Sequence, residues 1–289
     1  MNRYLVLQRI VELGSFTKAA LELHLTQSAV SQSISSLEDE LHIKLLNRNR
    51  GGVDLTPEGK LLYPHIEKVC YELRAVKERA SELQGLESGT VRIATMGSIS
   101  AHWLPSLIAA FQKEHPNIEF ALLQGDYAAT AEWIKSGAVD FGFVNPHAVS
   151  GIKTFPVKEG RMLAVLPPEH RLCAYEKVPL EELAREPFIL LEEGGYSEPL
   201  KAFEELDLKL QIGYTIHDDY AIMNMVEAGL GVSMLAELMM RRISYRLEIR
   251  PTIPQVIRPI SVGYKDALSL STAARRFLEL LRMKAPSLP

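Results

Sequence analysis

Residues 15–41 read SFTKAALELHLTQSAVSQSISSLEDEL, and this stretch decides the fold of the N-terminal part of the chain. We predict two short helices separated by a tight turn at His24–Leu25. Ser15 and Thr26 each stand where a helix begins, so their hydroxyls can accept from the first free backbone N–H groups. In the second helix the apolar residues are spaced like one buried face of an α-helix. They are Val30, Ile34, Leu37 and Leu41.

The opposite face of this second helix is short, polar and free of charge as far as Glu38. It carries Gln27, Ser28, Ser31, Gln32 and Ser35. Such a face suits the major groove of DNA, where Gln can bond an adenine edge and Ser can bond several bases. An ordinary amphipathic helix pair would give the same apolar spacing, so periodicity alone leaves both interpretations open.

Several short segments match a known family in order and spacing. They are Gly14–Thr17, Ala19–Ala20, Thr26–Ser31, Leu37–Glu38 and Leu55–Gly59. Through them the N-terminal part resembles the LysR-type transcriptional regulators, whose winged helix-turn-helix binds DNA. The chain departs from the residues usual in that family at Ser28, Gln32, Ser33, His42 and Leu46. The resemblance therefore implies the scaffold, but it does not transfer the base-reading residues or the operator sequence.

We expect the polar helix face to read bases and nearby cations to bind phosphates. The expected DNA-binding residues are Thr26, Gln27, Ser28, Ser31, Gln32, Ser35, Lys18, Lys44, Arg48 and Arg50. Residues 1–60 hold equal numbers of basic and acidic side chains, so bulk charge does not indicate nucleic acid. The cluster after the second helix does so modestly, because phosphate contacts supply most non-specific affinity. A solvated loop would show the same cluster.

A first helix at Arg3–Leu13, a turn at Asn47–Gly52 and a strand at Val53–Leu55 complete a predicted winged helix-turn-helix over residues 1–57. Thr56 and Pro57 then mark the start of a long helix, with a hydroxyl cap and Pro at the first position.

Residues 58–87 carry an apolar seam with alternating spacings of four and three, which predicts a coiled-coil linker helix. The seam residues are Leu62, Ile66, Val69, Leu73, Val76, Ala80 and Leu83. A rod of roughly 40 Å cannot bury such a seam against the small N-terminal domain, so we predict that it forms a dimer. Packing against the chain's own body is the alternative.

From Thr90 onward short strands alternate with helices, which predicts mostly parallel sheets covered on both faces. We place an effector-binding domain at residues 90–289, with lobe I at about 90–161 plus 265–289 and lobe II at about 162–264. Two lobes joined by crossing segments leave a cleft that suits a small molecule. The family resemblance, through Gly137–Gly142 and Glu227–Val232, implies the same periplasmic-binding-protein-like domain.

Ligands in such sheets lie beyond the carboxyl ends of the strands. The expected effector-binding residues are Ser98, Ile99, Ser100, Asp126, Thr130, Asn145, Glu193, Tyr196, His217 and Asp219. The serines begin a helix, where an anion is favoured, and the resemblance implies a ligand carboxylate there; simple capping is the alternative. The remaining loops hold acids and no Lys or Arg, which favours a ligand with a cationic or hydroxyl-rich part, such as an amino acid.

The rest of the sequence bounds the class of protein. Two cysteines make no disulfide framework, and no apolar run approaches the ~20 residues that span a membrane. We expect no metal, no cofactor and no membrane contact, and a cytoplasmic homodimer or homotetramer that binds a pseudo-palindromic operator. RNA polymerase is a further partner that the resemblance allows. No catalytic motif stands out; an enzyme and a solute-binding protein are the alternatives.

Overall fold

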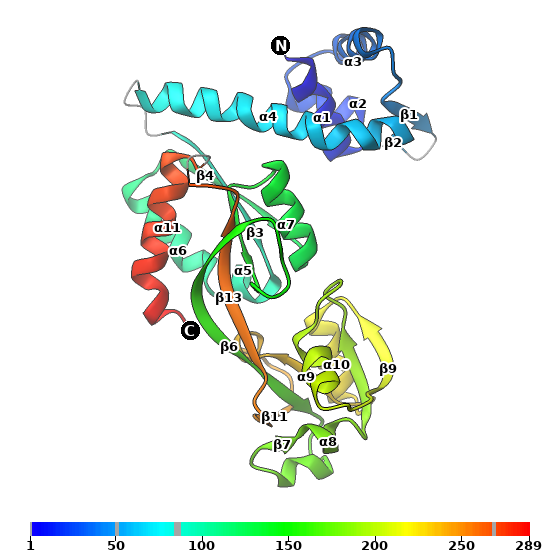
Figure 1. The fold of residues 1–289 in the computed structure, drawn as a ribbon, viewed down its shortest axis with the longest axis vertical. Helices are drawn as coiled ribbons and strands as arrows, with labels where there is room; N and C mark the ends of the chain where they lie inside the picture. The colour runs from blue at the N-terminus through cyan, green and yellow to red at the C-terminus, as the bar shows by residue number, and fades with distance from the viewer. Residues whose placement is uncertain (1, 50–51, 84–87, 268–269) are drawn as a thin grey trace. The chain divides into compact units, whose positions relative to one another are not determined.

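The computed structural model describes residues 2–49, 52–83, 88–267 and 270–289. The chain divides into an N-terminal unit that ends near Ser88 and a C-terminal unit that begins at Gly89. Figure 1 shows the elements of each unit. Within the described residues, no helix is both long enough and apolar enough to cross a membrane.

The N-terminal unit begins with three helices, α1 (Arg3–Leu13), α2 (Phe16–Glu22) and α3 (Gln27–Leu41). The predicted caps are confirmed: Ser15 Oγ accepts from the N–H of Lys18 at 3.3 Å, and Thr26 Oγ1 accepts from the N–H of Ala29 at 3.2 Å. The predicted apolar face of α3 is buried against α1 and α2. This packing leaves the polar face of α3 directed away from the domain core.

An antiparallel hairpin follows, made of β1 (Leu46–Asn49) and β2 (Gly52–Leu55). The prediction of a turn over Asn47–Gly52 was wrong for Asn47–Asn49, because these residues pair in register with β2. Polar residues on a short exposed hairpin carry no apolar alternation, so the strand left no signal in the sequence.

The long helix α4 (Pro57–Leu83) begins where Thr56 and Pro57 predicted. Thr56 Oγ1 accepts from the N–H of Gly59 at 2.8 Å and donates to the carbonyl of Lys44 at 2.7 Å, so one hydroxyl both caps the helix and anchors the preceding loop.

The predicted seam on α4 is divided between two environments. Ile66 is buried in the core of the N-terminal domain and Leu62 packs against that core, so the inclusion of Ile66 in an intermolecular seam was wrong. Val69 and Val76 are 40% and 67% exposed, and Leu61, which was not predicted, is 77% exposed. The side chain of Leu83 lies outside the described residues.

Lobe I of the C-terminal unit is a sheet with helices on both faces (Figure 1). Its strands are β3 (Gly89–Thr95), β4 (Ile118–Gln124) and β5 (Phe141–Val144), with β3 parallel to both neighbours. Its helices are α5 (Gly97–His102), α6 (Leu104–Glu114), α7 (Tyr127–Ser136) and α11 (Thr272–Lys284). Trp103, Phe141 and Phe277 belong to the core beneath α6 and α11.

The apolar spacing of Trp103, Leu107 and Phe111 predicts a single helix over Ser98–Lys113, but the structure has two, divided at Trp103. Pro105 lacks the N–H that would continue the hydrogen-bond ladder from the preceding turn, so the chain must restart the helix there. The division leaves α5 as a short helix. Ser98 at its start lies beside Arg258, and Trp103 after its end lies in the core of lobe I.

Lobe II has its own core, which includes Phe188, Ile222 and Met223. Its strands are β7 (Val178–Pro179), β8 (Pro187–Leu191), β9 (Gln211–Ile216), β10 (Ser233–Ala236), β11 (Glu248–Arg250) and β12 (Thr252–Ile253). Its helices are η1 (Arg171–Ala174), α8 (Leu180–Leu183), α9 (Glu198–Glu205), α10 (Asp219–Glu227) and η2 (Glu237–Met240). A short helix η3 (Ala285–Ser287) follows α11.

Two long strands, β6 (Lys153–Leu166) and β13 (Ile257–Tyr264), pair antiparallel and connect the lobes. β13 also pairs with β5 of lobe I, and β6 also pairs with β10 and β11 of lobe II. The register of the β6–β13 pair shifts between Ile260 and Ser261. The apolar run Met162–Leu166 predicts a strand, but β6 begins nine residues earlier, at Lys153. The first half of β6 is polar and half-exposed, so it carries no apolar run.

Candidate DNA-reading face and effector site

The uncharged face of α3 is open to solvent in this chain. Gln27, Ser28, Gln32 and Ser35 are exposed, while Ser31 is half-buried. Thr26 Oγ1 and Ser28 Oγ lie 2.9 Å apart, so the first turn presents linked hydroxyls beside the Gln27 amide. Both amide and hydroxyl groups can donate to and accept from base edges.

A buried carboxylate fixes the loop that follows α3. Glu38 accepts from Lys44 Nζ at 2.7 Å and from the N–H groups of Leu45 and Leu46 at 2.8 and 3.2 Å. Burial alone would raise the pKa of Glu38, but Lys44 and the two backbone donors together hold that pKa below its ordinary value. Lys44 is 73% exposed, so its charge is shared between this ion pair and solvent.

The other predicted phosphate contacts are distributed around α3. Lys18 is exposed in the first turn of α2. Arg48 lies in β1 opposite Val53, and its side chain is not among those described. Arg50 lies outside the described residues. The first strand of the hairpin therefore carries one of the predicted phosphate-binding residues, Arg48.

The C-terminal unit holds a buried guanidinium that the sequence analysis did not identify. Arg258 lies on the connecting strand β13 and is almost completely buried. Its Nε donates to Tyr127 Oη at 2.8 Å, Nη1 lies 3.5 Å from Ser98 Oγ, and Nη2 lies 3.3 Å from Glu193 Oε1. A single strand residue thus contacts both lobes. An arginine within an otherwise apolar predicted strand was the signal available in the sequence.

Glu198 completes this network from lobe II. Its Oε1 accepts from Tyr127 Oη at 2.7 Å and from Asn145 Nδ2 at 2.9 Å, and lies 3.8 Å from Arg258 Nε. Its Oε2 is buried and has no hydrogen-bond partner among the described residues; the same is true of Thr130 Oγ1. Buried polar atoms are normally satisfied, so an unsatisfied carboxylate oxygen on a residue that lies beside Arg258 is a candidate ligand contact.

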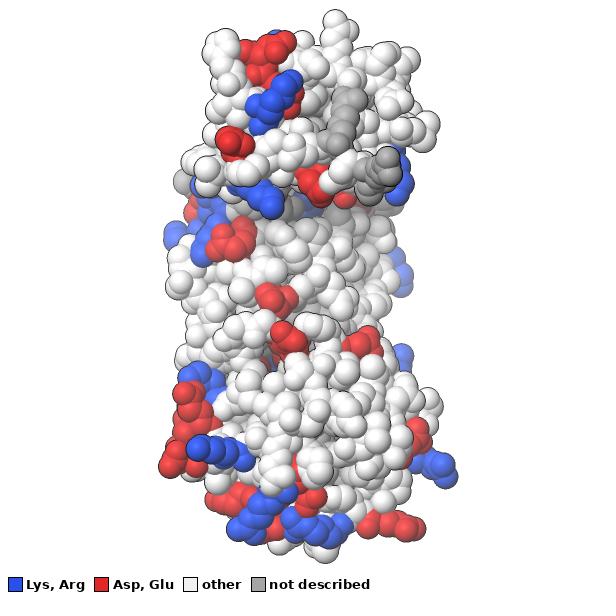
Figure 2. All heavy atoms as spheres, turned by 90° about the vertical axis from the view of Figure 1, so that its right-hand side faces the viewer, with Lys and Arg blue, Asp and Glu red and all other residues white. Residues whose placement is uncertain are grey.

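Negative charge exceeds positive charge around Arg258. Burial raises the pKa of Glu193; Arg258 opposes the shift, whereas Glu198, Asp219 and Asp126 add to it. Burial likewise raises the pKa of Asp219, again against the influence of Arg258. Figure 2 shows the charged side chains on one outer face of the molecule, where acidic and basic groups are separated by neutral surface.

The structure brings most of the predicted effector residues into this region. Asp126 caps α7 by accepting from the N–H of Ala129 at 2.7 Å, and a side chain at Gly194 (φ +79°) would collide with its carboxylate. Tyr196 packs edge-on against Tyr127. These contacts join the loops after β4 and β8 at one place.

Three predicted effector residues are placed differently. Ile99 belongs to the core of lobe I, so its side chain was wrongly assigned to a ligand site. Ser100 Oγ donates to the carbonyl of Gly97 at 3.0 Å, as a residue does within a helical turn. His217 is 78% exposed and pairs with Glu192, away from Arg258. Sequence position alone cannot say which way a loop side chain points.

Comparisons with known proteins identify both units. The family model for the bacterial regulatory helix-turn-helix protein, lysR family, matches residues 1–60. The family model for the LysR substrate binding domain matches residues 84–286. The uncharacterized HTH-type transcriptional regulator YvbU of Bacillus subtilis is 32% identical over 286 residues, which cover 96% of each chain.

Solved structures share the whole architecture. A full-length OxyR variant from Pseudomonas aeruginosa aligns with a TM-score of 0.72 at 21% identity, covering 99% of this chain and 97% of that one. Full-length CbnR in complex with its target DNA aligns with a TM-score of 0.69 at 20% identity, covering 97% of each chain. The chain belongs to the LysR family and is a DNA-binding transcription regulator with an effector-binding domain, not an enzyme.

Proposed function

We propose that this regulator reads its operator with the exposed face of α3 and holds the duplex with flanking cations. The observation that carries the proposal is the exposure of Gln27, Ser28, Gln32 and Ser35 on a helix whose opposite face is buried. Amides and hydroxyls on such a helix match the donors and acceptors of the major groove. Lys18, Lys44, Arg48 and Arg50 would contact phosphates, which position the helix but carry no sequence information.

Lys44 has a second role in this proposal. The ion pair with Glu38 sets the loop after α3 in one conformation, so the ammonium is held in place before DNA arrives. An exposed lysine in a surface ion pair loses little on exchanging part of that contact for a phosphate. Affinity would then depend on salt through a small number of contacts, because the domain as a whole is electrically balanced.

The protein acts as a dimer in this proposal, through the part of α4 that its own domain leaves uncovered. Leu61, Val69 and Val76 are exposed, and Leu73 is half-buried between them. Large apolar side chains repeated along one helix are stabilised by a second copy of the same helix. A dimer presents two α3 helices, which fits an operator with two half-sites.

The effector, in this proposal, binds beside Arg258 and is a small molecule with an amino group, such as an amino acid. Glu193, Asp219 and the unsatisfied oxygen of Glu198 offer acceptors to an ammonium, and Arg258 offers donors to a carboxylate. Glu193 and Glu198 belong to lobe II and Tyr127 and Asn145 to lobe I, so a ligand among them contacts both lobes. Its binding would shift the equilibrium between poses of the lobes.

The test is footprinting of the full-length protein on the intergenic DNA beside its own gene, with and without single amino acids. We expect protection of a two-part site, and a change in its extent with one of the amino acids. A protein that protected no part of this DNA at low salt would contradict the operator proposal. Protection that no amino acid altered would contradict the effector class alone.

A further inference from the structure

Glu198 lies at the start of α9 in lobe II, but its side chain reaches groups of lobe I. Its Oε1 accepts from Tyr127 Oη at 2.7 Å and from Asn145 Nδ2 at 2.9 Å. Tyr127 is the first residue of α7 and Asn145 directly follows β5, so both donors belong to lobe I. Arg258 Nε, on the connecting strand β13, lies 3.8 Å from the same oxygen. This carboxylate of lobe II therefore faces two hydrogen-bond donors and a guanidinium that lobe II does not supply.

The donors around Glu198 are held in place by contacts of their own. Asn145 is fully buried, and its Oδ1 accepts from the N–H of His147 at 2.9 Å, which turns Nδ2 toward Glu198. Tyr127 Oη accepts from Arg258 Nε at 2.8 Å, so its own proton is left to donate. Burial raises the pKa of Tyr127 against the influence of Arg258, so the hydroxyl keeps this proton. These fixed donors form a site that suits a carboxylate.

Glu198 satisfies this site only in part. Its Oε2 is buried and accepts no hydrogen bond within the part of the chain that the structure describes. An acid in the first turn of a helix needs no burial, because the helix dipole favours it at the surface as well. Glu198 is nevertheless only 3% exposed, and a buried oxygen without a donor is unfavourable. The local needs of α9 therefore do not explain why this carboxylate is buried, whereas the donors of lobe I do.

We propose that Glu198 is a built-in occupant of a carboxylate site formed by Tyr127, Asn145 and Arg258, and that an acid must displace it in order to bind there. This inference rests on the proposed function, in which the carboxylate of the effector binds Arg258. The exchange leaves the charge at the donors unchanged, because one carboxylate leaves and another takes its place. The displaced Glu198 is then available to accept hydrogen bonds from the amino group of the effector.

The exchange would change how the two lobes are held together. Glu198 belongs to α9, so its hydrogen bonds to Tyr127 and Asn145 tie lobe II to lobe I. A free acid at the same donors carries no such tie. Competition also sets the apparent affinity, because an acid binds only the fraction of molecules in which Glu198 has left the site. The concentration of effector that is needed for a response is thus raised by a side chain of the protein itself.

The experiment removes the occupant and supplies acetate in its place. Glu198→Ala deletes a carboxymethyl group, which acetate matches in size and charge. Thermal unfolding of the full-length protein is followed with acetate, with acetamide as a neutral ligand of nearly the same shape, and with chloride at equal ionic strength. We expect acetate alone to raise the unfolding temperature of Glu198→Ala, because a ligand that binds the folded state stabilises it. The dissociation constant of acetate should be at least about tenfold lower for Glu198→Ala than for the wild type.

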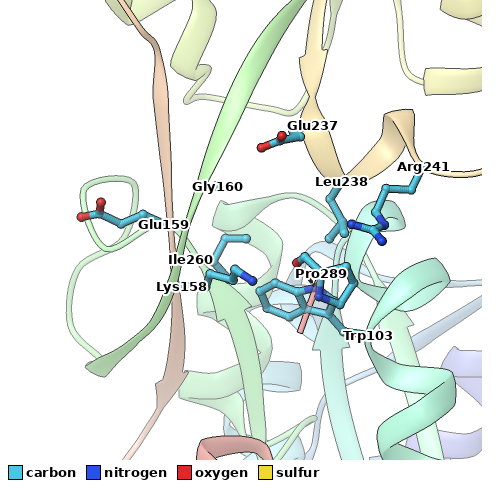
Figure 3. Close-up of a pocket in the computed structure, with 9 residues that line it drawn as sticks. All are labelled: Trp103, Lys158, Glu159, Gly160, Glu237, Leu238, Arg241, Ile260 and Pro289. Atoms are coloured by element: carbon cyan, nitrogen blue, oxygen red, sulfur yellow. Dashed lines mark hydrogen bonds between the residues drawn. The ribbon is translucent and has the colours of Figure 1, made fainter. Parts of the chain in front are cut away.

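Acetate that bound elsewhere would act on variant and wild type alike. Figure 3 shows one cationic place of this kind, a pocket lined by Trp103, Lys158 and Arg241. Glu198 does not line that pocket, so acetate held there would stabilise wild type and Glu198→Ala equally. Glu205→Ala, at the exposed other end of α9, is the matched control and should behave like the wild type. Equal stabilisation of all three proteins, or no stabilisation of Glu198→Ala, would overturn the proposal.

A second variant keeps the test decisive if Glu198→Ala does not fold. Glu198→Gln keeps the volume of the side chain and an oxygen that can accept from Tyr127. It lacks the negative charge, and it therefore occupies the site less firmly than a carboxylate does. Acetate should then stabilise Glu198→Gln more than it stabilises the wild type. Equal stabilisation of these two proteins would contradict the competition between Glu198 and a free acid.

Amide hydrogen exchange tests the tie between the lobes separately. Tyr127→Phe removes one donor to Glu198 and leaves the sequence of α9 unchanged. Exchange in the first turn of α9 should become faster in this variant, because Glu198 is held less firmly, whereas the amides at the end of α10 serve as a reference in the same lobe. Unchanged exchange in α9 would show that Glu198 does not tie the lobes. No DNA and no amino acid enters these measurements, so their failure is distinguishable from a failure of the operator or effector proposals.

Discussion

Glu38 is buried and Glu193 is half-buried, and each lies beside a cation, yet their pKa values shift in opposite directions. Glu38 accepts from an ammonium and two backbone N–H groups at 2.7 to 3.2 Å. Glu193 lies 3.3 Å from an arginine that also serves Glu198 and Tyr127, and other acids surround it.

The difference separates a structural carboxylate from a site residue. Donors that point at Glu38 stabilise its charged form, so contacts within the domain hold the residues that follow α3. The carboxylates around Arg258 share too few donors, and groups with such unbalanced environments cluster at functional sites. A cationic ligand would supply the hydrogen-bond donors that the carboxylates around Arg258 lack.

The largest expected effect is on the stability of the effector domain. Arg258→Met would leave Glu193 and Glu198 buried without a counter-charge, and should cost about 3–5 kcal/mol in urea unfolding of the full-length protein. Arg161→Met, which removes a half-exposed arginine from the pair with Glu237, is the control and should cost far less. Equal losses in the two variants would mean that the network at Arg258 is no more demanding than a surface pair.

Replacing the structural carboxylate should cost less. Glu38→Gln keeps the shape of the side chain but weakens the three hydrogen bonds, and should destabilise the N-terminal domain by about 1–3 kcal/mol. Because the folded pKa of Glu38 lies below its ordinary value, its contribution is present above that value and is lost as the pH falls through the folded pKa. The difference between wild type and Glu38→Gln should therefore shrink in acid. A difference that stayed constant from neutral pH into acid would contradict this role for Glu38.

Glu193 should give the opposite slope. Its folded pKa is raised, so its contribution to stability is fully present below the ordinary value of 4.5 and is lost as the pH rises through the folded pKa. The free energy of unfolding of the wild type, relative to that of Glu193→Gln, should thus decrease from mild acid to neutral pH. Parallel curves for the two proteins would contradict the acidic character of the site and the preference for an amine.

The remaining effects concern DNA affinity and leave the fold unchanged. They test whether the loop held by Glu38 contacts phosphates or reads bases. Gln32→Ala should lower affinity by about 1–3 kcal/mol for operators with the preferred base and change little for others, measured across a set of single-base variants. Lys44→Ala should weaken every sequence alike and reduce the slope of log affinity against log salt by about 1. If Lys44→Ala changed base preference instead, the loop would be a reader.

The sequence was informative where local rules decide the outcome. The caps at Ser15, Thr26 and Thr56 were predicted from residue type and are present, because a hydroxyl at a helix start has few competing partners. Strands such as β5 and β8 could be predicted because their buried residues form continuous apolar runs.

Tertiary contacts decided what the sequence could not. Arg258 gave no loop signal, since it stands in a strand and meets its partners only when segments more than 60 residues apart come together. Ile66 fits a heptad as well as Val69 does, and only the packing of the N-terminal core removes it from the exposed set. The same limit explains Ile99 and His217, whose positions in a loop or turn did not reveal their direction.

The paired strands β6 and β13 constrain how the two halves of the effector domain can move. Backbone hydrogen bonds join the two strands along their length, so the strands resist separation from each other. Twisting of the pair, or bending at an irregularity, keeps these bonds. That irregularity falls between Ile260 and Ser261, two residues beyond Arg258. A ligand that binds this guanidinium would therefore act next to the one irregular step that the β6–β13 register shows within its described residues, where the strand pair can bend.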